Sequence, residues 1–258
     1  MPIRLTQTVK ILLVVCFGSF VIQQTGDQFF GTHFLEIFAL NSSVLSTYRF
    51  WQLFTYAFMH GEVMHLFFNL MMLAFIGSEL EALWGTRAFL RYTVFCTLSA
   101  GLIFVLLHII PIARGTLPSG HVMIGASAAI YGLLMAYGMV FGNRVLLFMM
   151  LFPMKAKHFI WVLASLELLT TLYSSGGAWA GIAQLGGMAA GFCYLRVSAM
   201  ASKGGRGGPI SKHFKKRRSK HLKLVVDHTR GKNLGTTSGT RSGSQTNEDG
   251  PDHPRTWH

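Results

Sequence analysis

The most apolar positions of the chain gather in six long segments that are separated by shorter, more polar stretches. Five of these segments approach the length that a helix needs to cross about 30 Å of hydrocarbon, and the first is shorter because Gly18 and Ser19 interrupt it. We therefore predict an all-α membrane protein with six membrane-spanning helices. The predicted spans are approximately residues 9–22, 54–76, 88–110, 122–141, 156–173 and 178–197.

The first segment has an alternative interpretation, because Arg4 and Lys10 precede it as they would precede a signal-peptide core. No small-residue cleavage site follows in the sequence FVIQQTGD, which favours an uncleaved first span.

Basic residues define an orientation for the six spans. If the N-terminus is cytoplasmic, the outer loops carry only Arg49 and Arg114. This bias matches the positive-inside rule, and it requires an even number of spans with both termini inside. The residues then on the inner side are Arg4, Lys10, Arg87, Arg91, Arg144, Lys155, Lys157 and the basic C-terminal tail.

Composition separates the tail from the rest of the chain. The whole chain is 51% hydrophobic with a net charge of +13, and residues 199–258 carry nine of those net positive charges. We therefore divide it into a membrane domain, residues 1–198, and a basic, disordered cytoplasmic tail, residues 199–258, that contacts anionic lipid. The run HFKKRRSKHLK contains no interleaved aromatic pattern or surrounding fold, so no nucleic-acid partner is expected.

No residue spacing in the chain indicates a metal or a cofactor. The three cysteines fall inside apolar segments and show no disulfide or metal-site spacing. The stretch HGEVMH contains the residue types of a HExxH zinc motif, but His60 and His65 are five residues apart and do not share a helix face.

Polar side chains within the spans are candidate functional residues, because they are costly in a bilayer. In the predicted orientation, the second, fourth and sixth spans each carry polar groups in their outer part. These are His60, His65 and Asn69 on the second span, Ser127 and Tyr131 on the fourth, and Gln184 on the sixth. Glu167 in the fifth span is a separate case, and the sequence assigns it no partner.

Local spacing sharpens this candidate site. His65 and Asn69 are four residues apart and share a helix face. Ser127 stands where the fourth helix begins, so unpaired backbone N–H groups form an oxyanion site beside its hydroxyl, although a simple N-cap is the alternative. Glycines and alanines recur every four residues in both the fourth and sixth spans, which predicts that these two helices pack closely and bring Ser127 near Gln184. The small residues are Ala128, Gly132, Ala136, Gly187 and Gly191.

Together these motifs resemble the rhomboid intramembrane serine proteases. The matching elements are HGEVMHLFFN on the second span, GASA at the start of the fourth, FPMKAK before the fifth and the glycine-spaced sixth span. The resemblance extends from about residue 10 to residue 196 and excludes the tail. It implies a rhomboid-type helical bundle that cleaves peptide bonds in single-span membrane proteins.

The resemblance also implies residue roles. Ser127 would be the nucleophile, and His65 and Asn69 would form the oxyanion hole with the Ser127 backbone N–H. His60 and Gly125 would be structural.

Further roles concern neighbouring regions. Tyr131 would stack against the general base, and Glu81 would brace the inner junction between spans two and three. Residues 23–52 would form a partly embedded first loop, which here ends in Trp51-Gln52 where the family has Trp-Arg. Residues 146–152 would lie at the membrane interface before the fifth span.

One departure from the family pattern concerns the general base. The stretch AQLGGMAAG keeps every element of the family's AHxxGxxxG pattern except the histidine, which is Gln184 here. A carboxamide is neutral and scarcely basic, so Gln184 cannot take the proton of Ser127. His121, six residues before Ser127, is the candidate substitute base.

Two functions follow as alternatives. The first is an intramembrane serine endopeptidase that works weakly or with an unusual base, and the second is a pseudoprotease that binds transmembrane segments without cutting them. A transporter is disfavoured, because the spans lack interrupted helices with facing charges. We expect a multi-pass protein of a bacterial inner (plasma) membrane.

Overall fold

The computed structural model describes residues 4–114, 121–148, 152–173 and 178–203. The chain divides into two compact units, residues 1–216 and 217–258, and the second lies wholly outside the described residues. The predicted tail, residues 199–258, therefore also lies outside them, except where the last helix continues to Lys203.

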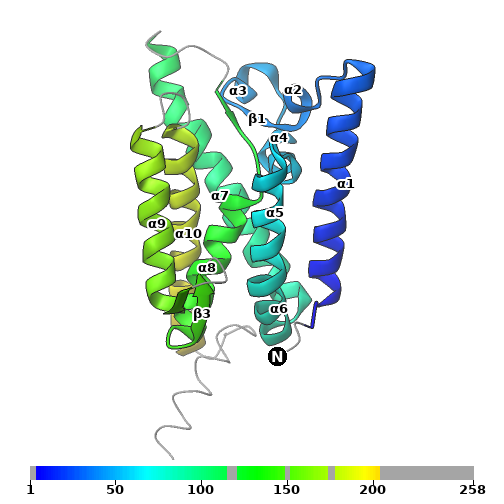
Figure 1. Ribbon diagram of the computed structural model, residues 1–258. Helices are drawn as coiled ribbons and strands as arrows, with labels where there is room; N and C mark the ends of the chain where they lie inside the picture. Colours follow the sequence, from blue (N-terminus) through cyan, green and yellow to red (C-terminus); the bar gives the residue numbers. More distant parts are fainter. Residues whose placement is uncertain (1–3, 115–120, 149–151, 174–177, 204–258) are drawn as a thin grey trace, which may run out of the picture. The chain divides into compact units, whose positions relative to one another are not determined.

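Long helices make up most of the first unit (Figure 1). Among the described residues, three helical stretches are long and apolar enough to cross a membrane: Gln7–Phe30, Val63–Trp84 and Thr86–Ile109. A fourth apolar helix, Ser127–Phe141, is shorter. The molecule is thus an integral membrane protein with several apolar helices, and the count of six spans and their orientation stay predictions. The long helices are α1 (Gln7–Phe30), α5 (Val63–Met72), α7 (Thr86–Ala113), α8 (Ser127–Phe141), α9 (Ala156–Tyr173) and α10 (Ala178–Lys203), with α5 continuing through a π-helical turn, η2 (Leu73–Gly77), into α6 (Ser78–Trp84).

Several helix boundaries differ from the predicted spans. Helix α1 continues past residue 22 to Phe30 and ends at Gly31, whose φ of 61° lies in the left-handed region that glycine adopts most easily. The second long helix begins at Val63 rather than residue 54, because α4 (Gln52–Thr55) and a 3₁₀ turn, η1 (Tyr56–Phe58), precede it. Helix α8 begins at Ser127, because residues 122–123 belong to a strand.

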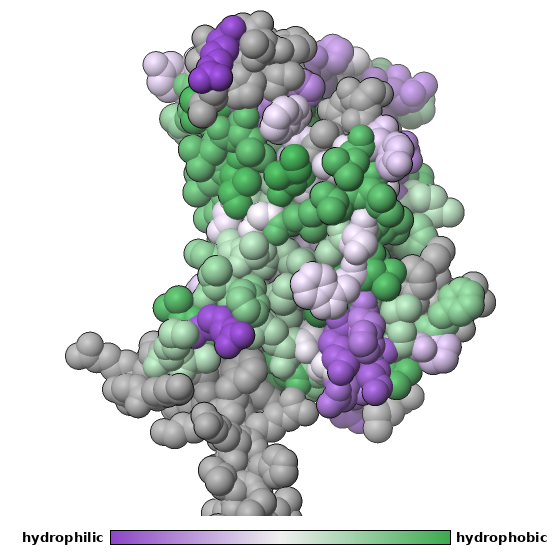
Figure 2. Space-filling view, turned by 90° about the vertical axis from the view of Figure 1, so that its left-hand side faces the viewer, coloured by the Kyte–Doolittle hydropathy of each residue, from purple (hydrophilic) through white to green (hydrophobic). Residues whose placement is uncertain are grey.

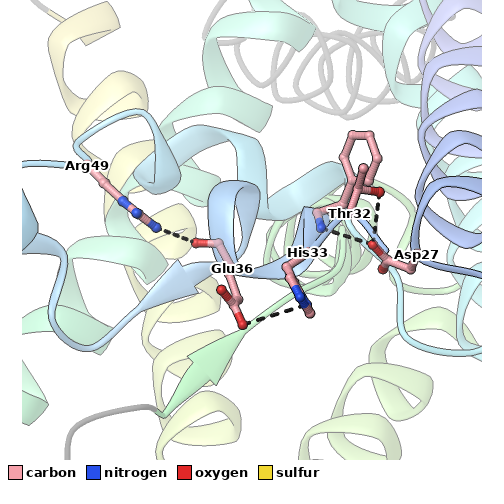
Figure 3. Close-up of polar contacts among 6 residues, drawn as sticks. Asp27, Thr32, His33, Glu36 and Arg49 are labelled. Carbon is pink, nitrogen blue, oxygen red and sulfur yellow. Dashed lines mark hydrogen bonds and ion pairs between the residues drawn. The ribbon is translucent and has the colours of Figure 1, made fainter. Parts of the chain in front are cut away.

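The segment between α1 and α5 is a folded loop with its own polar contacts. It contains α2 (Phe34–Phe38), β1 (Leu40–Asn41) and α3 (Val44–Thr47). In Figure 3, Asp27 accepts hydrogen bonds from the Thr32 hydroxyl and from the backbone N–H of Phe34, at 3.4 and 3.1 Å. Arg49 donates to the carbonyl of Glu36 at 2.9 Å, and the Glu36 carboxylate also lies 3.9 Å from the His33 ring.

Gln52 organises the same loop from inside. Its side chain is fully buried, donates to the carbonyls of Glu36 and Ile37 at 3.1 Å each, and accepts from the N–H of Asn41 at 3.2 Å. The neighbouring Trp51 donates from its indole nitrogen to Ile37 at 2.9 Å. The neutral amide of Gln52 therefore links α2 to β1, at the position where the family pattern has arginine.

Two small antiparallel sheets amend the all-α prediction. Strand β1 pairs with β2 (Val122–Met123), and β3 (Val145–Phe148) pairs with β4 (Phe152–Lys155). The second pair covers most of the segment that we expected to be an interfacial piece. The first pair ties the approach to Ser127 to the loop between α1 and α5.

Helix α10 packs against α7, α8 and α9, and its glycines Gly187 and Gly191 face α7. A Cβ atom on Gly187 would lie 2.8 Å from the Ala100 side chain, and one on Gly191 would lie 2.5 Å from the Tyr92 hydroxyl. Gly132 of α8 likewise lies against Cys96 of α7. Helices α8 and α10 therefore pack together as predicted, but Gly132, Gly187 and Gly191 lie against α7 rather than between α8 and α10.

Glu81 stands at the junction that the sequence predicted for it. Its buried carboxylate accepts hydrogen bonds from the Thr86 hydroxyl at 2.7 Å, from the N–H of Val9 at 3.1 Å, and from the Thr6 hydroxyl. It therefore connects the end of α6 with the starts of both α7 and α1.

Apolar side chains cover much of the molecular surface that Figure 2 shows, and the strongly hydrophilic residues gather toward its ends. On α9, Trp161 is 68% exposed and Leu172 is 71% exposed. Exposed apolar surface of this extent fits helices that face lipid.

Candidate functional site

A cavity of about 510 Å³ is lined by residues of four helices, and five of the predicted site residues are among them: His65, Asn69, Ser127, Tyr131 and Gln184. In Figure 1, α8 lies between α5 and α9, and the cavity is bounded by these three helices and by α10. Two of its lining side chains, Phe68 on α5 and Leu166 on α9, are also exposed, and we take these two residues as the mouth of the cavity. The lining residues are His65, Phe68, Asn69, Met71, Met72, Ser127, Ile130, Tyr131, Leu134, Phe159, Leu163, Leu166, Glu167 and Gln184.

Ser127 is the first residue of α8, and the chain that leads to it is held in place. The N–H of Gly125 donates to the carbonyl of Tyr56 at 2.9 Å, and the N–H of Ser42 donates to the carbonyl of His121 at 2.9 Å. The N-cap position is Ala126, so the alternative in which Ser127 is a simple N-cap does not apply. Its Oγ is buried and has no hydrogen-bond partner in the described part of the chain.

Gly125 brings the helix α5 side chains close to the start of α8. Its φ of +100° lies in a region that residues with a side chain rarely adopt. A Cβ atom there would lie 2.6 Å from Cε1 of His65 and 3.5 Å from Nδ2 of Asn69. The structure thus gathers the predicted oxyanion residues, His65 and Asn69, at the helix terminus that carries Ser127.

His60 orients this group from behind. Its Nδ1 lies 3.2 Å from the carbonyl of Phe58, and its Nε2 lies 3.1 Å from Nδ2 of Asn69. Because an amide nitrogen only donates, we assign the ring proton to Nδ1 and the acceptor role to Nε2. His60 precedes α5, and its burial lowers its pKa to about 4, which is consistent with a neutral ring.

Gln23 is a supporting residue that the sequence analysis missed, because it was placed at the start of a loop. It lies on α1, is 2% exposed, and its amide bonds both backbone groups of His60, at 2.8 and 3.4 Å. No local spacing in the sequence marks a buried glutamine whose partner is a distant backbone segment. The supporting role of Gln23 is therefore visible only in the fold.

The wall of the cavity formed by α9 and α10 has fewer hydrogen bonds among the described residues. Gln184 lines the cavity but forms no hydrogen bond with Ser127 or with any other residue that the structure describes. Tyr131, predicted to stack against the base, instead donates from its hydroxyl to Oε2 of Glu167 at 2.8 Å. Glu167 therefore has a partner that the sequence could not assign, because the two residues lie on different helices.

His121, the predicted substitute base, is in a separate aromatic cluster. Its ring centroid lies 5.4 Å from that of His108, which in turn lies 5.6 Å from that of Trp179. His121 is not among the residues that line the cavity. The geometry therefore gives no contact through which His121 would take the proton of Ser127.

Within the described residues, no group of three or more His, Cys, Asp or Glu side chains is placed to hold a metal ion. The cavity thus presents hydroxyl, imidazole, amide and carboxylate groups from membrane helices. Such a site in such a bundle defines a rhomboid-like integral membrane protein.

Comparison with known proteins agrees with this class. The chain belongs to the family described as "Eukaryotic integral membrane protein (DUF1751)", which it matches over residues 8–218. It is also similar to "Rhomboid-like protein 15" of Arabidopsis thaliana, with 27% identity over 154 residues, or 58% of this chain and 38% of that protein. The chain therefore spans well under half the length of this relative.

These matches confirm the rhomboid-like resemblance seen in the motifs. The family is described as eukaryotic, so the expectation of a bacterial inner membrane is not supported.

Proposed function

We propose that this protein binds single transmembrane segments of other membrane proteins at the cavity between α5, α8, α9 and α10, and does not cleave them efficiently. It is, on this proposal, a rhomboid-like pseudoprotease whose partners are single-span membrane proteins.

The observation that carries the proposal is that Ser127 and Gln184 line the same cavity. Hydrolysis by a serine needs a group that accepts the hydroxyl proton, and a neutral carboxamide does not accept it. In a soluble serine protease, loss of the catalytic histidine lowers turnover by about 10⁶-fold. The Ser127 hydroxyl also has no acceptor within the described structure.

Cavity size and access support a binding role. A volume of about 510 Å³ is far smaller than a membrane helix, which is about 30 Å long and 10 Å across. A partner segment would therefore lie against the mouth at Phe68 and Leu166 and insert individual side chains.

We propose the six-span arrangement with both termini cytoplasmic as the setting of this site. The distribution of basic residues supports it, and α8, α9 and α10 would supply the fourth, fifth and sixth spans. The basic tail would then face the inner leaflet and contact anionic lipid.

A second candidate function is intramembrane serine endopeptidase activity. One arrangement favours it: the unpaired Ser127 hydroxyl stands at the start of α8, beside His65 and Asn69, where donors would stabilise an oxyanion. Oxyanion stabilisation and binding alone give about 10³–10⁴-fold over water in serine proteases. Slow Ser127-dependent cleavage is the expected signature of this candidate.

The test compares cleavage by the full chain, purified and reconstituted in liposomes with a labelled single-span substrate. Wild type, Ser127→Ala and Gln184→His are assayed together, along with the double variant. The proposal predicts no product from wild type, and a product from Gln184→His that disappears when Ser127 is also replaced. A wild-type product that Ser127→Ala removes would establish the second candidate instead.

Binding is measured separately, by energy transfer between the labelled protein and a labelled transmembrane peptide. Leu163→Trp, which fills the cavity, should weaken binding about tenfold, a loss of about 1.4 kcal/mol. The matched control is Leu168→Trp on the same helix, at a side chain that is 46% exposed and does not line the cavity. Equal binding by both variants would place the partner elsewhere.

A further inference from the structure

Glu167 brings a carboxylate into the cavity. It lies on α9, and one of its oxygens, Oε2, accepts the Tyr131 hydroxyl at 2.8 Å. The other oxygen, Oε1, lies 3.0 Å from the position that a Cβ on Gly181 would occupy. Glu167 is partly exposed, and it lines the same cavity as Ser127 and Gln184.

The cavity provides no cation for this carboxylate. Its lining residues include no lysine or arginine, and the remaining titratable group, His65, lies against Gly125 on the α5 side. The ion pairs of the described residues join His33 to Glu36 and Arg144 to Glu79, and none involves Glu167. A single hydroxyl donor therefore serves a group that can accept several hydrogen bonds.

A carboxylate among membrane helices is costly unless a charge partner accompanies it. A buried charge without its partner is strongly unfavourable, whereas a well-placed opposite charge with hydrogen bonds offsets much of the desolvation cost. A lysine or arginine in a transmembrane segment has the same difficulty in lipid. Each group is thus the natural counter-ion of the other.

We infer that the cavity selects transmembrane segments that carry a lysine or arginine in the part of the segment level with Glu167. This inference rests on the proposed function, because it specifies which segments the site binds. The basic side chain enters between Phe68 and Leu166 and pairs with the free Oε1 of Glu167, while Tyr131 holds the other oxygen. Gln184 and Ser127 supply further hydrogen-bonding groups to the same guest.

The position of Glu167 along α9 defines where the basic residue should lie in the partner segment. Glu167 lies six residues from the end of α9 at Tyr173, or about 9 Å along the axis. A basic residue about six positions from the corresponding end of a partner helix lies at the same depth.

The experiment uses the full chain in phosphatidylcholine liposomes and host peptides of about 21 leucine and alanine residues. A single guest position, six residues from one end, holds Lys, Leu, Gln or Glu. We expect wild type to bind the Lys peptide about tenfold more tightly than the Leu peptide, and the Glu peptide most weakly. Glu167→Gln should abolish the roughly tenfold advantage of the Lys peptide over the Leu peptide.

The control variant is Glu36→Gln, which removes the same charge from an exposed loop residue outside the cavity. It should preserve the Lys preference. The ranking of the four peptides on wild type tests the inference even if Glu167→Gln does not fold.

The possible outcomes distinguish failure of the charge selection from failure of the proposed binding function. Equal binding of Lys and Leu peptides by wild type overturns the charge selection and leaves the binding function intact. Equal binding of Lys and Gln peptides also overturns it, because hydrogen bonding alone would then account for selection. If no peptide binds, the proposed function itself fails.

Discussion

The polar side chains on the two sides of the cavity differ in how many contacts hold them in place. On the α5 side, Asn69 is hydrogen-bonded to the buried His60, and the His65 ring packs against Gly125, whose backbone conformation needs glycine. On the α9–α10 side, Gln184 has no hydrogen bond to the described residues, and Glu167 has only the Tyr131 hydroxyl.

The two sides would serve different tasks: the α5 side would bind a partner, and the α10 side would have to accept a proton. The α5 side provides donors at fixed positions, which suits the recognition of a carbonyl or an oxyanion. A histidine on the α10 side would provide the proton acceptor, and a neutral amide stands there instead. This contrast agrees with the proposed binding function, and stability measurements on each side of the cavity test the contrast.

The largest effect is expected for Gly125→Ala, on the α5 side. The new Cβ would meet the His65 ring at 2.6 Å and would be strained at a φ of +100°. We expect a loss of about 3 kcal/mol of unfolding free energy, measured by denaturation in mixed detergent micelles. Gly18→Ala is the control, since its Cβ would have no neighbour within 4 Å. Similar losses for both variants would show that Gly125 is not under steric constraint.

An intermediate effect is expected for Asn69→Ala. The substitution leaves the buried Nε2 of His60 without its donor, which lies at 3.1 Å, and should cost about 1–2 kcal/mol. The same measurement on Asn143→Ala, an exposed position between α8 and β3, should change the stability by less than about 0.5 kcal/mol. An unchanged stability for Asn69→Ala would contradict the view that His60 and Asn69 act as one structural unit.

The smallest effect is expected for Gln184→Leu, on the α10 side. Because no hydrogen bond is lost, the unfolding free energy should change by less than about 0.5 kcal/mol. Gln23→Leu is the matched comparison, because it removes two bonds to the His60 backbone at 2.8 and 3.4 Å and should cost about 2 kcal/mol. A loss for Gln184→Leu as large as that for Gln23→Leu would mean that the α10 side is as firmly organised as the α5 side.

Much of the candidate site was predictable because its residues stand in short motifs. The spacing of His65 and Asn69 and the glycine before Ser127 are local features, and the structure brings His65, Asn69 and Ser127 into one cavity with Gln184. The contact between Tyr131 and Glu167 was not predictable, since it joins side chains 36 residues apart across two helices. The role of Gln23 was hidden for the same reason.

Apolar length was enough to place this chain in a membrane, because the cost of exposing polar groups to lipid acts on each segment separately, and short motifs indicated its class. Boundaries and contacts between segments depend on neighbours that are remote in sequence. The glycine spacing predicted the close packing of α8 and α10, but Gly132, Gly187 and Gly191 themselves lie against α7. Likewise, residues 122–125, which lead to Ser127, are fixed by a strand pair at residues 122–123 and by the bond from Gly125 to Tyr56, since backbone groups must find partners across the fold.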